Sequence, residues 1–146
     1  MGKLLLLIAS FLVPPLQMAP AGWDIFASTR FELKYVEEMG VQAEVPTFDK
    51  EIKSLEGTEV TLTGYYLPFN VSKRSIILSR LPNASCFFCG GAAGQESVAQ
   101  IYFKEAHPQF KLDELVRVKG LLLLNSGLDG NLVFKLVNAE VVKREG

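Results

Sequence analysis

The sequence has almost no net charge. Its 146 residues contain 15 lysines and arginines against 16 aspartates and glutamates. Proteins that bind nucleic acid usually carry a basic patch that attracts phosphates, and this chain has neither a basic stripe nor an acidic tail. We therefore expect no nucleic-acid partner.

Residues that commonly perform chemistry are also scarce. The chain has one histidine, His107, and two cysteines, Cys86 and Cys89. No serine or acidic residue near His107 in the sequence indicates a catalytic triad. Since no catalytic set can be assembled, we expect a protein that is not an enzyme.

An apolar run opens the chain but is short. Leu4 to Val13 is apolar except at Ser10, about ten residues, whereas a membrane-spanning helix needs about 20. Lys3 precedes the run, and Ala19-Pro20-Ala21 follows it with the small residues that signal peptidases recognise. We predict that residues 1–21 are a cleaved signal peptide and that the protein is exported, to a periplasm or outside the cell. The alternative is that the segment stays uncleaved as a membrane anchor. If it is cleaved, we expect the chain to contact a membrane only through residues 1–21 and only before cleavage.

The rest of the chain suits one domain, with an N-terminal extension over residues 22–45 and a β domain over residues 46–146. Residues 22–28 read as a loose segment with Trp23 as its one anchor. Alternating apolar and polar side chains predict strands. They cover Phe31–Val36, Glu59–Phe69, Ser75–Arg80, Ser97–Lys104, Val116–Asn125 and Leu132–Lys143, the last with a bulge near Asn138. Pro46–Gly57 is expected to be helical or extended, and Glu105–Leu115 to contain one helical turn.

A short pattern occurs twice among these strands. Val60 to Gly64 and Val116 to Gly120 both read apolar, polar, apolar, polar, glycine. A glycine after an alternating half-strand allows a sheet to bend sharply as it closes on itself. We predict a mainly β protein: a five-stranded, OB-like Greek-key barrel with an N-terminal extension and one short helical turn. A different small β-sandwich or roll is the alternative.

The segment Cys86-Phe87-Phe88-Cys89-Gly90-Gly91 contains both cysteines. Two thiolates at this spacing are typical of half of a tetrahedral metal site and could chelate zinc or copper. A complete site needs more ligands, and His107 is the one histidine that could supply one. Metal handling is therefore one interpretation of the motif.

Two further interpretations stay open. Reactive Cys-x-x-Cys pairs usually begin a helix, and the glycines after the motif disfavour one, so thiol–disulfide exchange is less favoured. The structural interpretation is favoured. Here Cys86 and Cys89 form a bridge or pack as small apolar side chains, while Phe87 and Phe88 cover one mouth of the barrel as part of a binding surface.

Other aromatic residues are candidates for the same surface. A platform on which nucleic-acid bases stack could be formed by Tyr65, Tyr66, Phe69, Tyr102 and Phe103. The alternative, which we favour, is that these rings pack inside the barrel or at its rim.

Several segments together suggest a family. They are Pro46-Thr47-Phe48, Leu55-Glu56-Gly57, Gly64-Tyr65-Tyr66-Leu67-Pro68, Leu78-Ser79, Cys86-Phe87-Phe88-Cys89-Gly90, Glu96-Ser97-Val98, Gly120 to Asn125, and Asp129. This set resembles an uncharacterised family of small exported bacterial proteins with an OB-like β-barrel and a Cys-Phe-Phe-Cys-Gly motif. The resemblance implies export and the barrel fold, and it implies no established activity and no catalytic residues.

The sequence therefore predicts an exported, non-enzymatic binding module. We expect it to act through a barrel face and the Cys-x-x-Cys loop on an exported or membrane protein or on a small ligand. The alternatives are a metal-handling protein that uses the Cys86 and Cys89 thiolates, and a thiol–disulfide oxidoreductase.

Overall fold

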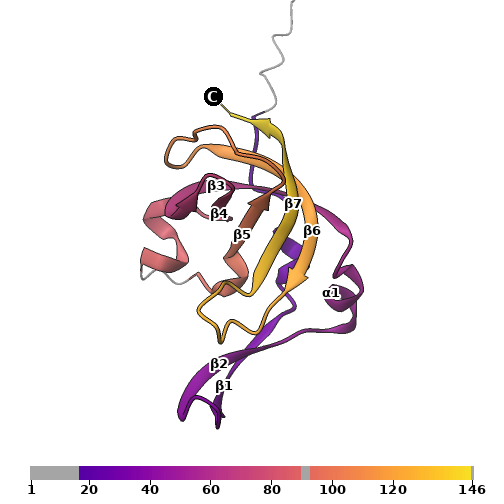
Figure 1. Cartoon of the computed structure of the whole chain (residues 1–146), viewed down its shortest axis with the longest axis vertical. Helices are drawn as coiled ribbons and strands as arrows, with labels where there is room; N and C mark the ends of the chain where they lie inside the picture. The colour runs from indigo at the N-terminus through magenta and orange to yellow at the C-terminus, as the bar shows by residue number, and fades with distance from the viewer. Residues whose placement is uncertain (1–16, 90–92, 146) are drawn as a thin grey trace, which may run out of the picture.

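The computed structural model describes residues 17–89 and 93–145 (Figure 1). The predicted signal peptide therefore lies mostly outside the described residues, as do Gly90 and Gly91. The elements, in chain order, are η1 (Trp23–Phe26), β1 (Arg30–Val36), β2 (Val41–Thr47), α1 (Lys50–Leu55), β3 (Glu59–Ser72), β4 (Ser75–Ser79), η2 (Asn83–Ser85), η3 (Phe87–Cys89), η4 (Gln95–Ser97), β5 (Val98–Phe103), β6 (Leu115–Leu124) and β7 (Phe134–Arg144). Here η denotes a short 3-10 turn.

Five strands close into a barrel in the order β3-β4-β5-β7-β6. Neighbouring strands run antiparallel except β5 and β7, which are parallel. This is the strand order of a five-stranded Greek-key barrel of the OB type, so the predicted fold class is confirmed. Each of the five strands predicted after residue 57 overlaps an observed strand.

The barrel interior is filled by alternate side chains of these strands. Fully buried examples from the five strands are Leu62, Leu78, Ile101, Leu122 and Leu136. Asn138 has a φ of 50°, and the pairing of β6 with β7 shifts between Lys119 and Leu121, opposite this residue. The bulge predicted near Asn138 is therefore confirmed.

The two glycines of the repeated pattern lie where other parts of the chain approach closely. A Cβ atom on Gly64 would lie 2.7 Å from Cζ2 of Trp23 and 2.8 Å from the backbone oxygen of Ser79. One residue later, at Tyr65, β3 changes its partner from β6 to β4. A Cβ atom on Gly120 would lie 3.0 Å from the backbone oxygen of Val137. Both positions have little room for a side chain.

The N-terminal segment is packed rather than loose, so that part of the sequence prediction is wrong. The indole N–H of Trp23 donates a hydrogen bond to the carbonyl oxygen of Thr63 at 2.9 Å. Phe26 is fully buried and stacks on Phe134 with ring centroids 4.0 Å apart. These two aromatic side chains join η1 to the barrel core, and Trp23 is indeed an anchor. The prediction failed because the partners of these rings are far away in the sequence.

Of the two segments expected to contain helix, only the first does. Asp49 caps α1 by accepting a hydrogen bond from the Ile52 amide at 3.0 Å. The helical turn predicted within Glu105–Leu115 is wrong. The amide of Asp113 donates to the carbonyl oxygen of Tyr66 at 3.0 Å, and its φ of 61° is left-handed. A hydrogen bond to β3 thus replaces the hydrogen bonds that a helix would form in this segment.

An ion pair fixes the end of this connection to β7. Arg144 donates from Nε and a terminal nitrogen to the two carboxylate oxygens of Glu114, at 2.7 and 3.0 Å. The Lys111 amide donates to the same carboxylate at 2.9 Å. Burial raises the pKa of Glu114, but these hydrogen bonds outweigh burial and hold the pKa below its usual value.

β1 and β2 form a hairpin that projects from the barrel (Figure 1). β1 confirms the strand predicted at Phe31–Val36, whereas β2 was not predicted. The chain turns at Gly40, whose amide donates to the carbonyl oxygen of Val36 at 2.9 Å with a φ of 67°. The predicted extension at residues 22–45 thus contains η1 and most of this hairpin.

Candidate functional site

The cysteine loop folds back onto the outer surface of the barrel. Cys86 is fully buried there against Leu67 of β3, Ile77 of β4 and Val98 of β5. Phe87 packs against the same group from the loop, and Leu132 does so from the connection between β6 and β7. We call these six residues the outer cluster. It is separate from the hydrophobic core inside the barrel.

A row of three aromatic rings extends from this cluster to the surface. The ring centroids of Phe87 and Phe88 are 5.3 Å apart, and those of Phe88 and Phe69 are 5.5 Å apart. Phe88 is 42% exposed and Phe69 is 37% exposed. Because the outer cluster holds Phe87, the two exposed rings are supported from beneath at fixed positions.

Phe69 and Phe88 form part of the wall of a cleft of about 260 Å³. Its lining consists of Phe69, Asn70, Ile77, Phe88, Gln100, Gly130, Asn131 and Leu132. Gln100 of β5 is buried, and its amide nitrogen lies 3.2 Å from the carbonyl oxygen of Ile76, to which it donates. The cleft therefore combines apolar rings with amide groups. We call it the outer cleft.

Hydrogen bonds stabilise the loop on the other side of the outer cleft. Asp129 accepts hydrogen bonds from the side-chain amides of Asn131 at 2.6 Å and Asn125 at 3.1 Å, and from the Asn131 backbone amide at 3.1 Å. These bonds, above all that from the Asn131 side chain, lower the pKa of Asp129 from 3.8 to about 2. Asn131 thus enters the cleft lining from a loop of defined conformation.

The predicted metal ligands are only partly described. The backbone of Cys89 lies in η3, but its side chain lies outside the described residues. Among the residues that are described, no group of three or more His, Cys, Asp or Glu side chains could hold a metal ion. The metal interpretation of Cys86 and Cys89 stays a prediction.

His107 lies in different surroundings from Cys86. Its Nε2 is 2.7 Å from the carbonyl oxygen of Ser72, and its Nδ1 is 2.7 Å from that of Pro108. The ring also stacks on Phe110 at 5.5 Å. Carbonyl oxygens only accept hydrogen bonds, so both contacts are hydrogen bonds when each ring nitrogen carries a proton. In this arrangement both ring nitrogens face protein carbonyl groups.

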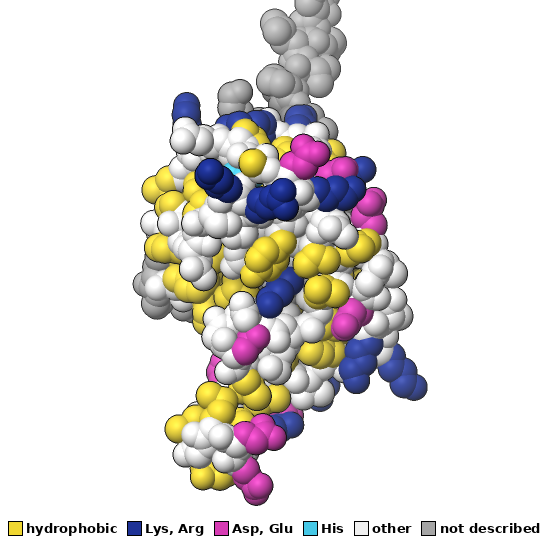
Figure 2. All heavy atoms as spheres, in the orientation of Figure 1, with side chains coloured by type: hydrophobic (Ala, Val, Ile, Leu, Met, Phe, Trp, Pro, Cys, Tyr) yellow, Lys and Arg dark blue, Asp and Glu magenta, His cyan; other side chains and the backbone are white. Residues whose placement is uncertain are grey.

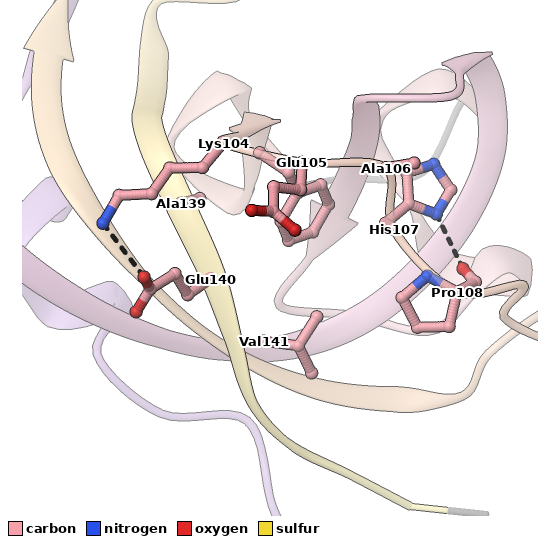
Figure 3. A pocket seen from close by; sticks show the side chains of 9 residues that line it. Lys104, Glu105, Ala106, His107, Pro108, Ala139, Glu140 and Val141 are labelled. Atoms are coloured by element: carbon pink, nitrogen blue, oxygen red, sulfur yellow. Dashed lines mark hydrogen bonds and ion pairs between the residues drawn. The ribbon is translucent and has the colours of Figure 1, made fainter.

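Figure 3 shows a second cleft, of about 330 Å³, beside His107. Lys104 and Glu140 lie on its rim and form an ion pair with a nitrogen–oxygen distance of 2.9 Å. The hydrogen bond from Lys104 lowers the pKa of Glu140. This pair is exposed and its two charges are already bonded to each other.

The two tyrosine candidates lie outside the outer-cleft lining. Tyr66 is buried among the interior side chains of the barrel, and its ring centroid is 5.5 Å from that of Phe110. Burial raises the pKa of its hydroxyl group. Tyr65 is half-buried on β3. Of the aromatic candidates, the structure thus brings Phe69, Phe87 and Phe88 together beside Cys86.

Sequence reasoning missed Gln100 and Asn131. The outward position of Gln100 in an alternating strand was its only signal, and Asn131 read as an ordinary turn residue. Among the described residues, no helix has the length and apolar character needed to cross a membrane. Comparisons of the chain with protein-family models, curated proteins and solved structures find no match.

Proposed function

We propose that this chain is an exported, non-enzymatic binding module and that the outer cleft is its ligand site. The observation that carries the proposal is the exposed pair Phe69 and Phe88 beside the amides of Gln100 and Asn131. The cleft lies over β4 and β5, the second and third strands of the barrel. OB-folds use this face, with the loops beside it, to bind ligands.

The lining defines the chemistry of the ligand. Exposed phenyl rings favour a flat apolar group, and the neighbouring amides favour a group that can donate and accept hydrogen bonds. A near-neutral protein gives little attraction for a polyanion. We infer that the ligand is a segment of an exported or membrane protein that presents an aromatic side chain, or a small molecule of the same character.

The burial of Cys86 favours binding over the two sulfur-based alternatives. Metal capture and disulfide exchange both need a sulfur atom that an ion or another thiol can reach. Cys86 is fully buried among aliphatic and aromatic side chains. Its contribution to the proposed function is to hold Phe87 and Phe88 in place.

The test uses the mature protein labelled with ¹⁵N and N-acetyl-tryptophanamide as the probe. We expect amide shifts confined to the outer cleft, at residues 69–70, 88, 100 and 130–132. Phe88→Ser should weaken binding about tenfold, because one aromatic contact contributes about 1 kcal/mol beyond its buried area. The control is Leu112→Ser, which changes another exposed apolar side chain, outside the cleft lining. Shifts centred elsewhere, or no loss of affinity in Phe88→Ser, would refute the assignment.

Export has a separate test. N-terminal sequencing of material recovered from outside the cytoplasm should show that the first 21 residues are missing. An intact Met1 would contradict this part of the proposal and would leave the outer cleft as a binding site.

A further inference from the structure

The hairpin has an open edge. β1 and β2 pair with each other, and within the described residues neither pairs with another strand. Leu33 and Tyr35 of β1 are 66% and 63% exposed. Figure 2 shows apolar side chains gathered on this projection, mixed with charged ones. A lone two-stranded hairpin is marginally stable in water, and an open strand edge can accept another strand.

The two edges of the hairpin are not equivalent. Pro46 lies in β2 and has no N–H to donate to a further strand. Glu44 of β2 accepts a hydrogen bond from Gln95, beside the barrel, at 3.0 Å. β1 contains no proline. The outer edge of β1 is therefore the one suited to pairing.

The sequence of β1 is complementary to itself. If two copies pair antiparallel with Leu33 opposite Leu33, then Glu32 lies opposite Lys34 and Phe31 lies opposite Tyr35. Residues directly opposite each other share a face of the sheet. One face then carries two Glu–Lys pairs, and the other carries two aromatic pairs with the leucines between them.

The registers centred on the two residues next to Leu33 lose this match. Centring the pairing on Glu32 places glutamate opposite glutamate and Lys34 opposite Arg30. Centring it on Lys34 places lysine opposite lysine. Like charges directly opposite each other destabilise a sheet. The charges of β1 thus favour the register centred on Leu33 over those centred on Glu32 and Lys34. A register centred on Phe31 also places Glu32 opposite Arg30, but residues 33–35 then lie opposite residues outside β1.

We propose that two copies of this chain associate through the outer edges of β1, antiparallel and centred on Leu33. The product is a four-stranded sheet, with β2 strands outside and β1 strands inside, related by a two-fold axis. The proposal is independent of the outer cleft. A stable interface buries about 800 Å² on each partner, more than one seven-residue edge provides. The dimer is therefore weak and depends on concentration.

The test measures molecular mass by sedimentation equilibrium, with the mature protein at concentrations up to about 1 mM. We expect the wild type to approach the dimer mass. Glu32→Lys and Lys34→Glu should each weaken association at least about tenfold, because each replaces two attractive pairs by repulsive ones. An equimolar mixture of the two variants should associate again, since every pair across the interface then has opposite charges.

The mixture separates pairing from folding. Glu32 and Lys34 also form an ion pair within β1 at 3.1 Å, and each single variant loses it in the same way. Mixing cannot restore that contact inside either chain. Recovery of the dimer in the mixture therefore reports contacts between chains. A double variant that carries both Glu32→Lys and Lys34→Glu in one chain should also form a dimer.

Four results of these experiments would overturn the proposal. The first three are a wild type that stays monomeric at about 1 mM, a dimer that neither single variant weakens, and a mixture that stays monomeric. A fourth is a wild-type dimer whose amide shifts on dilution lie outside β1, because another surface would then form the contact. If a different protein captures β1 while this chain alone stays monomeric, the second-copy proposal is likewise wrong.

Discussion

Gly64→Ala tests whether the barrel closes as described. The added Cβ would lie 2.7 Å from Cζ2 of Trp23 and 2.8 Å from the backbone oxygen of Ser79. Carbon contacts are normally about 3.5–4.0 Å, so both neighbours would have to move. Trp23 is fixed by its hydrogen bond to Thr63, and the Ser79 oxygen belongs to the backbone of β4. Neither can move easily.

The expected loss is at the upper end of the range for overpacked cores, about 3 kcal/mol in the free energy of unfolding. Urea denaturation measures it. With a slope of about 1–3 kcal/mol per molar urea, the midpoint should fall by about 1–3 M while the slope stays unchanged. Gly120→Ala should cost less, because its nearest contacts would be 3.0–3.2 Å.

Two further variants separate the causes. Gly40→Ala meets no atom within 4 Å but keeps a φ of 67°, so it measures backbone strain without crowding. Combining Gly64→Ala with Trp23→Ala should give less than the sum of the single losses, because one of the two clashes has been removed. If Gly64→Ala changes the free energy of unfolding by less than about 0.5 kcal/mol, the close approach of β3 to Trp23 and β4 is not as described.

Three other predictions follow from the loops and the outer cluster. The pKa of Asp129 is lowered from 3.8 to about 2, so its contribution to stability is complete above pH 3.8 and is lost as the pH falls toward 2. Asp129→Asn should remove this part of the pH dependence of unfolding. A variant that keeps the same pH dependence would contradict the assignment. Arg144→Met should cost about 2 kcal/mol in thermal unfolding, because it leaves Glu114, with a 5% exposed side chain, unpaired. The pKa of Glu114 should rise in that variant, and an unchanged acid transition would argue against the ion pair. Ile77→Ala should lower the free energy of unfolding by about 2–4 kcal/mol. Because Ile77 lies beneath the loop, amide hydrogen exchange should become faster selectively at residues 83–89. An equal change in exchange rate along the whole chain would show that the outer cluster does not hold the loop.

The barrel was predictable because its signals are local. Alternation identifies a half-buried strand from a few consecutive side chains, and the repeated glycine pattern marked Gly64 and Gly120. The structure adds the reason that Gly64 is needed, since a Cβ there would meet Trp23 and Ser79. Those neighbours lie far from it in sequence or on another strand, so the sequence alone could not name them.

The parts that were missed depend on non-local contacts. The strand β2 alternates only over residues 41–45 and then reaches Pro46, so its local signal is short and its pairing with β1 defines it. Residues 23–26 contain two aromatic side chains whose partners, Thr63 and Phe134, come much later in the chain. The expected helix near Phe110 was lost to hydrogen bonds with β3 and with the Glu114 side chain.

The candidate site was half predictable. The cysteine motif identified the loop, and its phenylalanines were named as binding candidates. The other side of the cleft comes from β5 and from the loop between β6 and β7, through Gln100 and Asn131. Such residues become neighbours only when the barrel closes, and nothing in their local sequence distinguishes them from ordinary polar residues.

A crystal of the mature protein soaked with N-acetyl-tryptophanamide tests the central claim most directly. We predict electron density for the indole ring against Phe88 and Phe69, with the acetamide group hydrogen-bonded to Gln100 or Asn131. An empty outer cleft in a crystal where no neighbouring molecule covers it, at a probe concentration that saturates the shifts in solution, would contradict the account.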